Sequence, residues 1–312
     1  MKDLNVLIYG TGAVGIYFGG RLSKAGFNTV FVDLTEKVNK IKDEGLHIQS
    51  VIDNDYDFIP TIVDDVSGLP PQDIILVCVK AFQTYDVAVN LVPVVKPSTV
   101  TLSLQNGLDN ESILSDILGK NLVMGSVLYF NGQLLNESTL LHQAPANIIF
   151  GELDHQRTQR EEWLSSILSH ADINHRISQT IREEIWKKFI WNNAYNSISA
   201  ITQTTLKQIN DFEEIMPTIR QMMREVQQVA QAEGIDIPDQ VLDELAGIDM
   251  QYGDVKTSML KDILSRQLPE LEPLVGVVLQ KAKLHNISTP VNKTIFNLIQ
   301  LSLCNAHIEI NE

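Results

Sequence analysis

Short apolar runs alternate with amphipathic segments through the first half of the chain. Several of these runs are bounded by Gly, Pro or Asn, which is typical of buried strands. They occupy residues 5–9, 29–32, 74–79, 99–104, 122–127 and 147–150. Helical segments separate them, and this alternation predicts a mostly parallel sheet with helices on both faces. Ligands of such sheets bind at the carboxyl ends of the strands.

A glycine-rich segment joins the first predicted strand to a helix that continues to about Lys24. The segment consists of Gly10, Thr11, Gly12, Ala13, Val14 and Gly15. In a GxGxxG segment at this place, the first glycine permits a tight turn and the second lets the backbone approach a pyrophosphate. The third lets the helix pack on the strand, and the helix N-terminus attracts the phosphates. The alternative is a glycine-rich turn in another kind of α/β protein.

Asp33 ends the second predicted strand, Thr29–Val32. A carboxylate at this place accepts hydrogen bonds from the ribose diol of an adenosine. Together with the glycine segment, it predicts a Rossmann domain that binds a dinucleotide.

The pattern changes near residue 180, where the β-branched runs stop. An apolar stripe then follows a helical period at Ile215, Ile219, Met222, Val226 and Val229. Residues 288–290 (Ser-Thr-Pro) predict an N-cap and first turn of a last helix that runs toward Cys304. We therefore predict an α/β protein with a doubly wound Rossmann domain at residues 1–178 and an all-helical substrate domain at residues 179–312.

Composition narrows the range of partners. The 312 residues are 44% hydrophobic and carry a formal charge of −15, which argues against nucleic acid and anionic membrane surfaces. No apolar stretch is long enough to span a membrane, and no signal-peptide pattern opens the chain.

Cys78 and Cys304 are expected to be buried, unpaired thiols of a cytoplasmic protein. The histidines show no metal-ligand spacing, so we expect no metal.

Two polar residues directly follow predicted strands of the first domain. Lys80 follows the run at 74–79, and Asn106 precedes Gly107 after the run at 99–104. Both would lie at the carboxyl edge of the sheet, where ligands bind. The alternatives are a solubilising charge for Lys80 and a simple Asn-Gly turn for Asn106.

The second domain contains two further candidate groups. Lys188, Asn192 and Asn196 are spaced by four, so they share one face of a helix that is otherwise rich in Trp, Phe and Ile. Such a stripe fits a polar cleft, although Lys188 alone would also fit an exposed helix face. Ser258 and Glu270 follow later in the chain, and Glu270 would also suit a helix start.

The order of these segments resembles the ketopantoate reductase family over nearly the whole chain. The family has a GxGxxG N-terminus, a strand-end lysine, an NG turn, a WxKxxxNxxxN helix and an SML segment with a glutamate twelve residues after its serine. Here the corresponding residues are Gly10–Gly15, Lys80, Asn106–Gly107, Trp186–Asn196, Ser258–Leu260 and Glu270.

The resemblance implies a hydride transfer between a nicotinamide cofactor and a 2-oxo acid. Lys188 would be the general acid that protonates the developing alkoxide, and Glu270 would orient it. Substrate would be held by Ser258, Asn192 and Asn196. Lys80 and Asn106 would line the nicotinamide end of the cofactor, with Asn106 also reaching the substrate.

The chain departs from the family pattern in two places. Most members prefer NADPH and place an arginine after the second strand, whereas this chain has Asp33 and Glu36, which would repel a 2′-phosphate. Lys37 lies near enough to complicate this argument, but we expect NAD as cofactor rather than NADP. After Asn196 the proline of the family's NPLTA segment and the asparagine of a later NG pair are absent, which favours a branched or aromatic 2-oxo acid such as benzoylformate, as in a D-mandelate-type D-2-hydroxyacid dehydrogenase.

Three alternatives remain open at this point. In the first, the substrate is 2-dehydropantoate, which is reduced to (R)-pantoate. In the second, the chain is a 3-hydroxyacid dehydrogenase, and in the third it is a dinucleotide-binding sensor without turnover. A homodimer is a further expectation, because the helical domain offers apolar faces for pairing.

Overall fold

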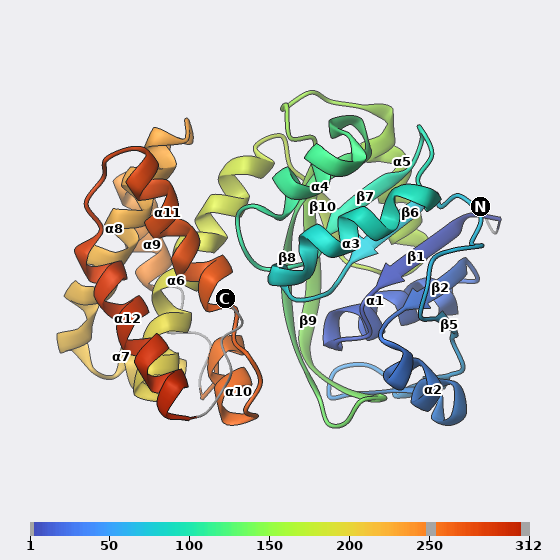
Figure 1. Cartoon of the computed structure of the whole chain (residues 1–312), viewed down its shortest axis with the longest axis horizontal. Coiled ribbons are helices and arrows are strands. Elements are labelled where there is room, and N and C mark those ends of the chain that lie inside the picture. The colour runs from blue at the N-terminus through green and yellow to red at the C-terminus, as the bar shows by residue number, and fades with distance from the viewer. Residues whose placement is uncertain (1–2, 248–253, 307–312) are drawn as a thin grey trace. The chain divides into compact units, whose positions relative to one another are not determined.

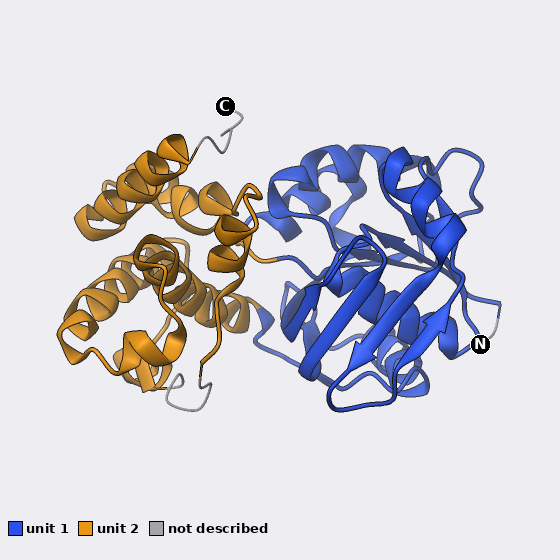
Figure 2. Cartoon of the chain, turned by 90° about the horizontal axis from the view of Figure 1, so that it is seen from below, with its two compact units in different colours: residues 1–105, 109–181 blue, residues 106–108, 182–312 orange. Residues whose placement is uncertain are grey.

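The structure, a computed structural model, describes residues 3–247 and 254–306 and divides into two compact units (Figures 1 and 2). Unit 1 consists of described residues within 1–105 and 109–181, and unit 2 of those within 106–108 and 182–312. The sequence prediction placed residues 106–108 in the first domain, whereas the structure groups them with the helical unit.

Unit 1 is built on a ten-stranded sheet in the described part of the chain. The strands are β1 (Asn5–Tyr9), β2 (Asn28–Val32), β3 (Leu46–Ser50), β4 (Tyr56–Phe58), β5 (Thr61–Val63), β6 (Ile74–Val77), β7 (Val100–Ser103), β8 (Val123–Leu134), β9 (Thr139–Gly151) and β10 (His175–Ile177). Their order is β4-β3-β9-β8-β7-β6-β1-β2-β5, and β10 pairs with β9. Pairing is parallel except between β3 and β4 and between β8 and β9, so the predicted mostly parallel sheet is confirmed.

Helices cover both faces of this sheet. The α-helices of unit 1 are α1 (Ala13–Lys24), α2 (Thr35–Glu44), α3 (Thr84–Leu91), α4 (Asn110–Leu118) and α5 (Gln159–His170), with 3-10 turns η1 (Ala81–Gln83), η2 (Val92–Val94) and η3 (Lys120–Leu122). Successive residues of a strand point to opposite faces. On β1, Ile8 packs in the apolar cluster that contains Phe18 of α1, while Leu7 packs in the cluster that contains Leu91 of α3 and Leu114 of α4.

Four strands were not predicted from the sequence, namely β3, β4, β5 and β10. They are three to five residues long and mix polar with apolar residues, so they lack the continuous apolar run of a central strand. The runs at 122–127 and 147–150 are parts of β8 and β9, which are longer than predicted and form an antiparallel pair. Cys78 is half-buried as a residue, and the prediction of a buried Cys304 was wrong, because that residue is exposed near the end of the last helix.

Unit 2 is helical, as predicted. Its helices are α6 (Ile181–Thr202), α7 (Leu206–Asn210), η4 (Glu213–Ile215), α8 (Met216–Ala232), α9 (Asp239–Gly247), α10 (Ser258–Leu264), the π-helical turn η6 (Glu272–Gly276), α11 (Val277–Leu284) and α12 (Pro290–Asn305). The predicted stripe on α8 forms part of the core, where Ile219, Met222, Val226 and Val229 are fully buried. No helix among the described residues is long and apolar enough to cross a membrane.

The last helix begins where the sequence predicted, with Thr289 at the N-cap and Pro290 in the first turn. Its cap, however, comes from another helix. The buried carboxylate of Glu225, on α8, accepts hydrogen bonds from the backbone N–H groups of Val291 (3.0 Å) and Asn292 (2.9 Å). A carboxylate at this place satisfies N–H groups that have no partner within their own helix and is favoured by the helix dipole.

Candidate active site

The glycine segment of unit 1 has the geometry that its sequence predicted. Gly10 has a φ of +102°, a conformation in which a side chain would be strained, and a Cβ there would lie 2.9 Å from Val79 Cγ1. A Cβ on Gly15 would lie 1.9 Å from the carbonyl oxygen of Gly10. The first glycine therefore permits the turn after β1, and the third permits α1 to pack against that turn.

The second glycine has open space around it. A Cβ on Gly12 would meet only the carbonyl oxygen of Cys78, at an ordinary contact distance of 3.8 Å. Gly12 is the N-cap residue of α1 and, having no side chain, supplies no cap of its own. The first N–H groups of α1 thus lack an acceptor from their own N-cap side chain, which is an arrangement that binds phosphate groups at helix N-termini.

Asp33 lies directly after β2 and contacts the glycine segment. Its Oδ2 accepts hydrogen bonds from the backbone N–H (2.6 Å) and the hydroxyl (2.5 Å) of Thr11, and its Oδ1 accepts one from the N–H of Leu34 (2.8 Å). Lys37 Nζ lies 3.2 Å from Asp33 Oδ2 and also donates to the carbonyl of Thr11 (2.8 Å). Burial alone would raise the pKa of Asp33, but Lys37 and these hydrogen bonds outweigh it and hold that pKa below its usual value.

The sequence analysis named Lys37 as a complication for the cofactor preference but did not assign it as a binding residue. Its position four residues after Asp33 is a spacing at which two side chains can contact one another. The ion pair places one cation beside the carboxylate that was expected to select the cofactor.

Lys80 lies in unit 1, at the N-cap position of η1, and is half-buried. It follows the end of β6, where the N–H of Cys78 donates to the carbonyl of Tyr9 (2.8 Å) beside the glycine segment. The carboxyl ends of β1, β2 and β6 therefore bring together Gly10–Gly15, Asp33 and the segment that carries Lys80, because the three strands are adjacent and parallel.

A polar group in unit 2 brings together three of the predicted residues. Lys188 Nζ donates to Asn106 Oδ1 at 3.2 Å, and Asn192 Nδ2 donates to the same oxygen at 3.3 Å. Lys188 and Asn192 are one turn apart on α6, so both reach the loop of residues 106–108, which belongs to the same unit. A lysine ammonium held by a neutral amide oxygen keeps protons that it can donate to a developing oxyanion.

The remaining predicted residues lie elsewhere in unit 2. Asn196 is buried one turn beyond Asn192 on α6, and Ser258 is the exposed first residue of α10. Glu270 is buried just before η6, and its carbonyl accepts a hydrogen bond from the N–H of Leu274 (3.1 Å). The pairing of Glu270 with Lys188 and the roles of Ser258 and Asn196 stay predictions. Among residues 3–247 and 254–306, no group of three or more His, Cys, Asp or Glu side chains is placed to hold a metal ion.

Comparisons with known proteins place this geometry in a family. Residues 6–155 match the sequence profile described as "Ketopantoate reductase PanE/ApbA", and residues 180–302 match that of its C-terminal part. The 2-dehydropantoate 2-reductase of Nostoc sp. is 27% identical over 96% of this chain and 95% of its own length.

Solved structures share the fold over nearly the whole chain. The PanE/ApbA family ketopantoate reductase from Ralstonia eutropha matches with a TM-score of 0.89 and 27% identity, covering 97% of this chain and 100% of that one. A dimeric ketopantoate reductase from Staphylococcus aureus matches with a TM-score of 0.80 and 25% identity, over 97% and 99% of the two chains. The ternary structure of D-mandelate dehydrogenase with NADH and anilino(oxo)acetate has a TM-score of 0.91 at 20% identity, over 97% and 100%, which is a likeness of fold.

Proposed function

The chain belongs to the ketopantoate reductase family of NAD(P)-dependent oxidoreductases, and from this membership we propose that it reduces 2-dehydropantoate to (R)-pantoate. The observation that carries the proposal is the contact of Lys188 Nζ with Asn106 Oδ1 at 3.2 Å, beside Asn192. It provides a proton donor and two amide groups for a substrate that gains a proton as it accepts hydride. Several curated relatives that cover nearly the whole chain, among them those of Nostoc sp. and Pyrococcus abyssi, are 2-dehydropantoate 2-reductases, which supports this substrate over a mandelate-like one.

In this proposal the nicotinamide supplies the hydride and the protein supplies position and a proton. The Gly10–Gly15 segment and the N-terminus of α1 bind the pyrophosphate, while Lys80 and Asn106 line the nicotinamide end. Lys188 donates its proton to the alkoxide oxygen that forms on the 2-oxo carbon, and Glu270 orients Lys188. Ser258, Asn192 and Asn196 hold the carboxylate and hydroxyl groups of the substrate.

A branched or aromatic 2-oxo acid is the second candidate substrate. It is favoured by the sequence after Asn196, where Ser197 stands in place of the proline of the family's NPLTA segment and the family's later asparagine is missing. Loss of a polar partner removes discrimination in favour of a substrate hydroxyl.

The test is a substrate panel with the full chain, NADH and NADPH. Ketopantoate, 2-oxoisovalerate, 2-oxoisocaproate and benzoylformate would be compared by kcat/KM. We expect ketopantoate to give the highest value. A higher value for benzoylformate would select the second candidate, and NADH binding without oxidation by any of the four would indicate a sensor.

We further propose NAD as the preferred cofactor, because Asp33 follows β2 and a dianionic 2′-phosphate would lie near it and Glu36. Lys37 opposes this preference, since its ammonium would attract the same phosphate. We expect kcat/KM for NADH to exceed that for NADPH, with the ratio falling in Asp33→Asn and rising in Lys37→Met. A wild-type value for NADPH equal to or above that for NADH would refute the preference.

We also propose that the chain forms a homodimer, on the precedent of the dimeric ketopantoate reductase from Staphylococcus aureus. Exposed leucines on the last two helices, Leu284, Leu298 and Leu301, offer apolar surface for pairing. Light scattering on the purified chain gives the oligomeric state directly.

A further inference from the structure

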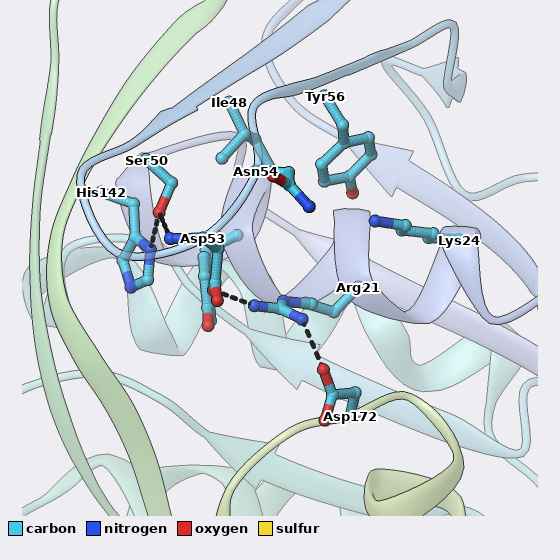
Figure 3. A pocket seen from close by; sticks show the side chains of 10 residues that line it. Arg21, Lys24, Ile48, Ser50, Asp53, Asn54, Tyr56, His142 and Asp172 are labelled. Carbon is cyan, nitrogen blue, oxygen red and sulfur yellow. Dashed lines mark hydrogen bonds and ion pairs between the residues drawn. The ribbon is translucent and has the colours of Figure 1, made fainter.

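Two polar clusters of unit 1 join segments that lie far apart in the sequence. The first surrounds Arg21, in the last turns of α1, and lines the pocket in Figure 3. Arg21 forms ion pairs with Asp53, in the loop after β3, and with Asp172, in the turn after α5. It lies at the opposite end of α1 from the glycine segment, so we assign it no part in the proposed chemistry. The second cluster lies at the carboxyl edge of the sheet, where the cofactor site is proposed.

Thr84 is the centre of this second cluster. It is the first residue of α3 and has no exposed surface. Its Oγ1 accepts a hydrogen bond from Gln105 Nε2 (2.9 Å). Two acceptors lie within reach of its single proton, the carbonyl oxygen of Ala81 (2.8 Å) and Asn110 Oδ1 (2.9 Å). The contact with Ala81 alone would be a local turn bond, but Gln105 and Asn110 are 21 and 26 positions away along the chain.

The side-chain amide of Gln105 is held at both of its ends. Its Oε1 accepts a hydrogen bond from Ser103 Oγ (3.0 Å), while its Nε2 donates to Thr84. Ser103 is the buried last residue of β7, and its carbonyl accepts a hydrogen bond from the hydroxyl of Ser126 on β8. Polar contacts therefore attach Gln105 to the sheet on one side and to α3 on the other.

Two partners of the central hydroxyl are chain neighbours of residues proposed to line the nicotinamide end. Ala81 follows Lys80, and Gln105 precedes Asn106. Asn106 Oδ1 accepts a hydrogen bond from Lys188 Nζ at 3.2 Å, so the place of Asn106 bears on where the proposed proton donor is held. Because a planar peptide bond joins Gln105 to Asn106, a displacement of the first residue displaces the second.

We propose that Thr84 is a positioning residue for the hydride transfer proposed above, on which this inference rests. Its hydroxyl fixes both ends of the loop of residues 106–108, through Gln105 before the loop and Asn110 after it. It also holds the turn that begins after Lys80. Thr84 itself touches neither cofactor nor substrate in this proposal, but it holds the segments whose residues do.

The test compares Thr84→Val, which nearly keeps the shape of the side chain but removes its hydroxyl, with Thr101→Val. Thr101 is an equally buried threonine on β7 whose hydroxyl has no hydrogen-bond partner among the described residues, so it is the matched control. Activity is measured with the best 2-oxo acid of the panel and expressed per NADH-binding site, so that only folded chains are counted.

We expect kcat to fall about 10- to 100-fold in Thr84→Val, up to the loss that a misplacement of about 1 Å causes. It should stay near the wild-type value in Thr101→Val. Thr84→Ser keeps the hydroxyl and should keep kcat near wild type. The affinity for NADH should change little, because Thr84 does not contact Gly10–Gly15 or Asp33.

Gln105→Met removes the other partner of the central contact and should lower kcat by a similar factor. The double variant Thr84→Val/Gln105→Met should lose little more than either single variant, because both changes break the same hydrogen bond. Amide NMR of the ¹⁵N-labelled chain reports the positioning without turnover. Thr84→Val should shift the signals of residues 105–108, and Thr101→Val should not.

Several outcomes would overturn the positioning role. They are a wild-type kcat in Thr84→Val, equal losses in Thr84→Val and Thr84→Ser, and additive losses in the double variant. A wild-type protein that oxidises NADH with none of the 2-oxo acids would refute the proposed function instead. The NMR signals of residues 105–108 would then test alone whether Thr84 holds the loop, and unchanged signals in Thr84→Val would show that it does not.

Discussion

Lys188 is the side chain on which the proposed chemistry depends most. Replacing it with alanine removes the proton donor but leaves Gly10–Gly15 and Asp33 in unit 1 intact. We expect kcat of Lys188→Ala to fall about 10²- to 10⁴-fold, the usual contribution of general acid catalysis, with the affinity for NADH unchanged. Steady-state kinetics and a fluorescence titration with NADH measure the two quantities.

Lys187→Ala is the matched control, because Lys187 is the neighbouring residue on α6 and does not belong to the Lys188–Asn192–Asn196 stripe. It should keep wild-type kcat. Equal activity of Lys188→Ala and wild type would show that the proton comes from another group.

His142 gives a second prediction at this scale, for the free energy of unfolding as a function of pH. Burial lowers the pKa of folded His142 below its ordinary value of 6.5, so the unfolded chain binds a proton more readily. The free energy of unfolding should therefore fall as the pH falls from about 6.5 toward the folded pKa. Urea unfolding between pH 5 and 8 measures this dependence.

His142→Phe keeps a ring beside Tyr17 and Phe130 and removes the titrating nitrogens. It should reduce the loss of stability below pH 6.5, whereas His170→Phe, a change at an exposed histidine, should not. The same acid dependence in wild type and His142→Phe would assign it to other groups.

At the scale of elements, two glycines in the turn from β1 into α1 have different roles. Gly15 is needed for the packing of the folded chain, and Gly12 is expected to be needed for binding of the cofactor. A Cβ on Gly15 would lie 1.9 Å from the carbonyl oxygen of Gly10, whereas one on Gly12 would meet only Cys78, at 3.8 Å. Gly15→Ala should lower the free energy of unfolding by about 1–3 kcal/mol, the usual effect of overpacking. Gly12→Ala should change it by no more than about 0.5 kcal/mol but weaken NADH binding at least about tenfold, because its Cβ would occupy the space for the pyrophosphate.

Urea unfolding of the ligand-free protein and a titration with NADH measure these two effects on both variants. Unchanged NADH affinity in Gly12→Ala would mean that the pyrophosphate does not approach this glycine.

The turn from β1 into α1 was predictable from the sequence because its signals are local. They are an apolar run, glycines at fixed spacing and the aspartate that follows the second strand, Asp33. Strand β3 was not, because its place in the sheet depends on pairing with β9, in which His47 lies opposite Thr139. The candidate active site was also predictable only in part. Spacing placed Lys188 and Asn192 on one helix face, but their shared contact with Asn106 joins residues more than 80 positions apart and has no local signal.

At the scale of the whole molecule, the division into two units does not follow the order of the chain. Leu108, which follows a strand of unit 1, packs against the apolar core of unit 2, while Leu104 is buried in the core of unit 1. We expect Leu108→Ala to speed amide hydrogen exchange in the helices of unit 2, and Leu104→Ala to speed it in the strands of unit 1. Hydrogen exchange with mass spectrometry distinguishes the two patterns. An effect of Leu108→Ala confined to unit 1 would contradict the assignment of the 106–108 loop.

The loop of residues 106–108 also determines which segments must be exchanged together when chimeras with related proteins are made. An exchange of everything after residue 181 would transplant α6 without the asparagine that Lys188 and Asn192 contact, because Asn106 is encoded between β7 and α4. A chimera that keeps the helical unit of one parent must therefore take residues 106–108 from that same parent. The helical unit is therefore encoded by two separate segments of the sequence, and a gene fusion must exchange both of them together.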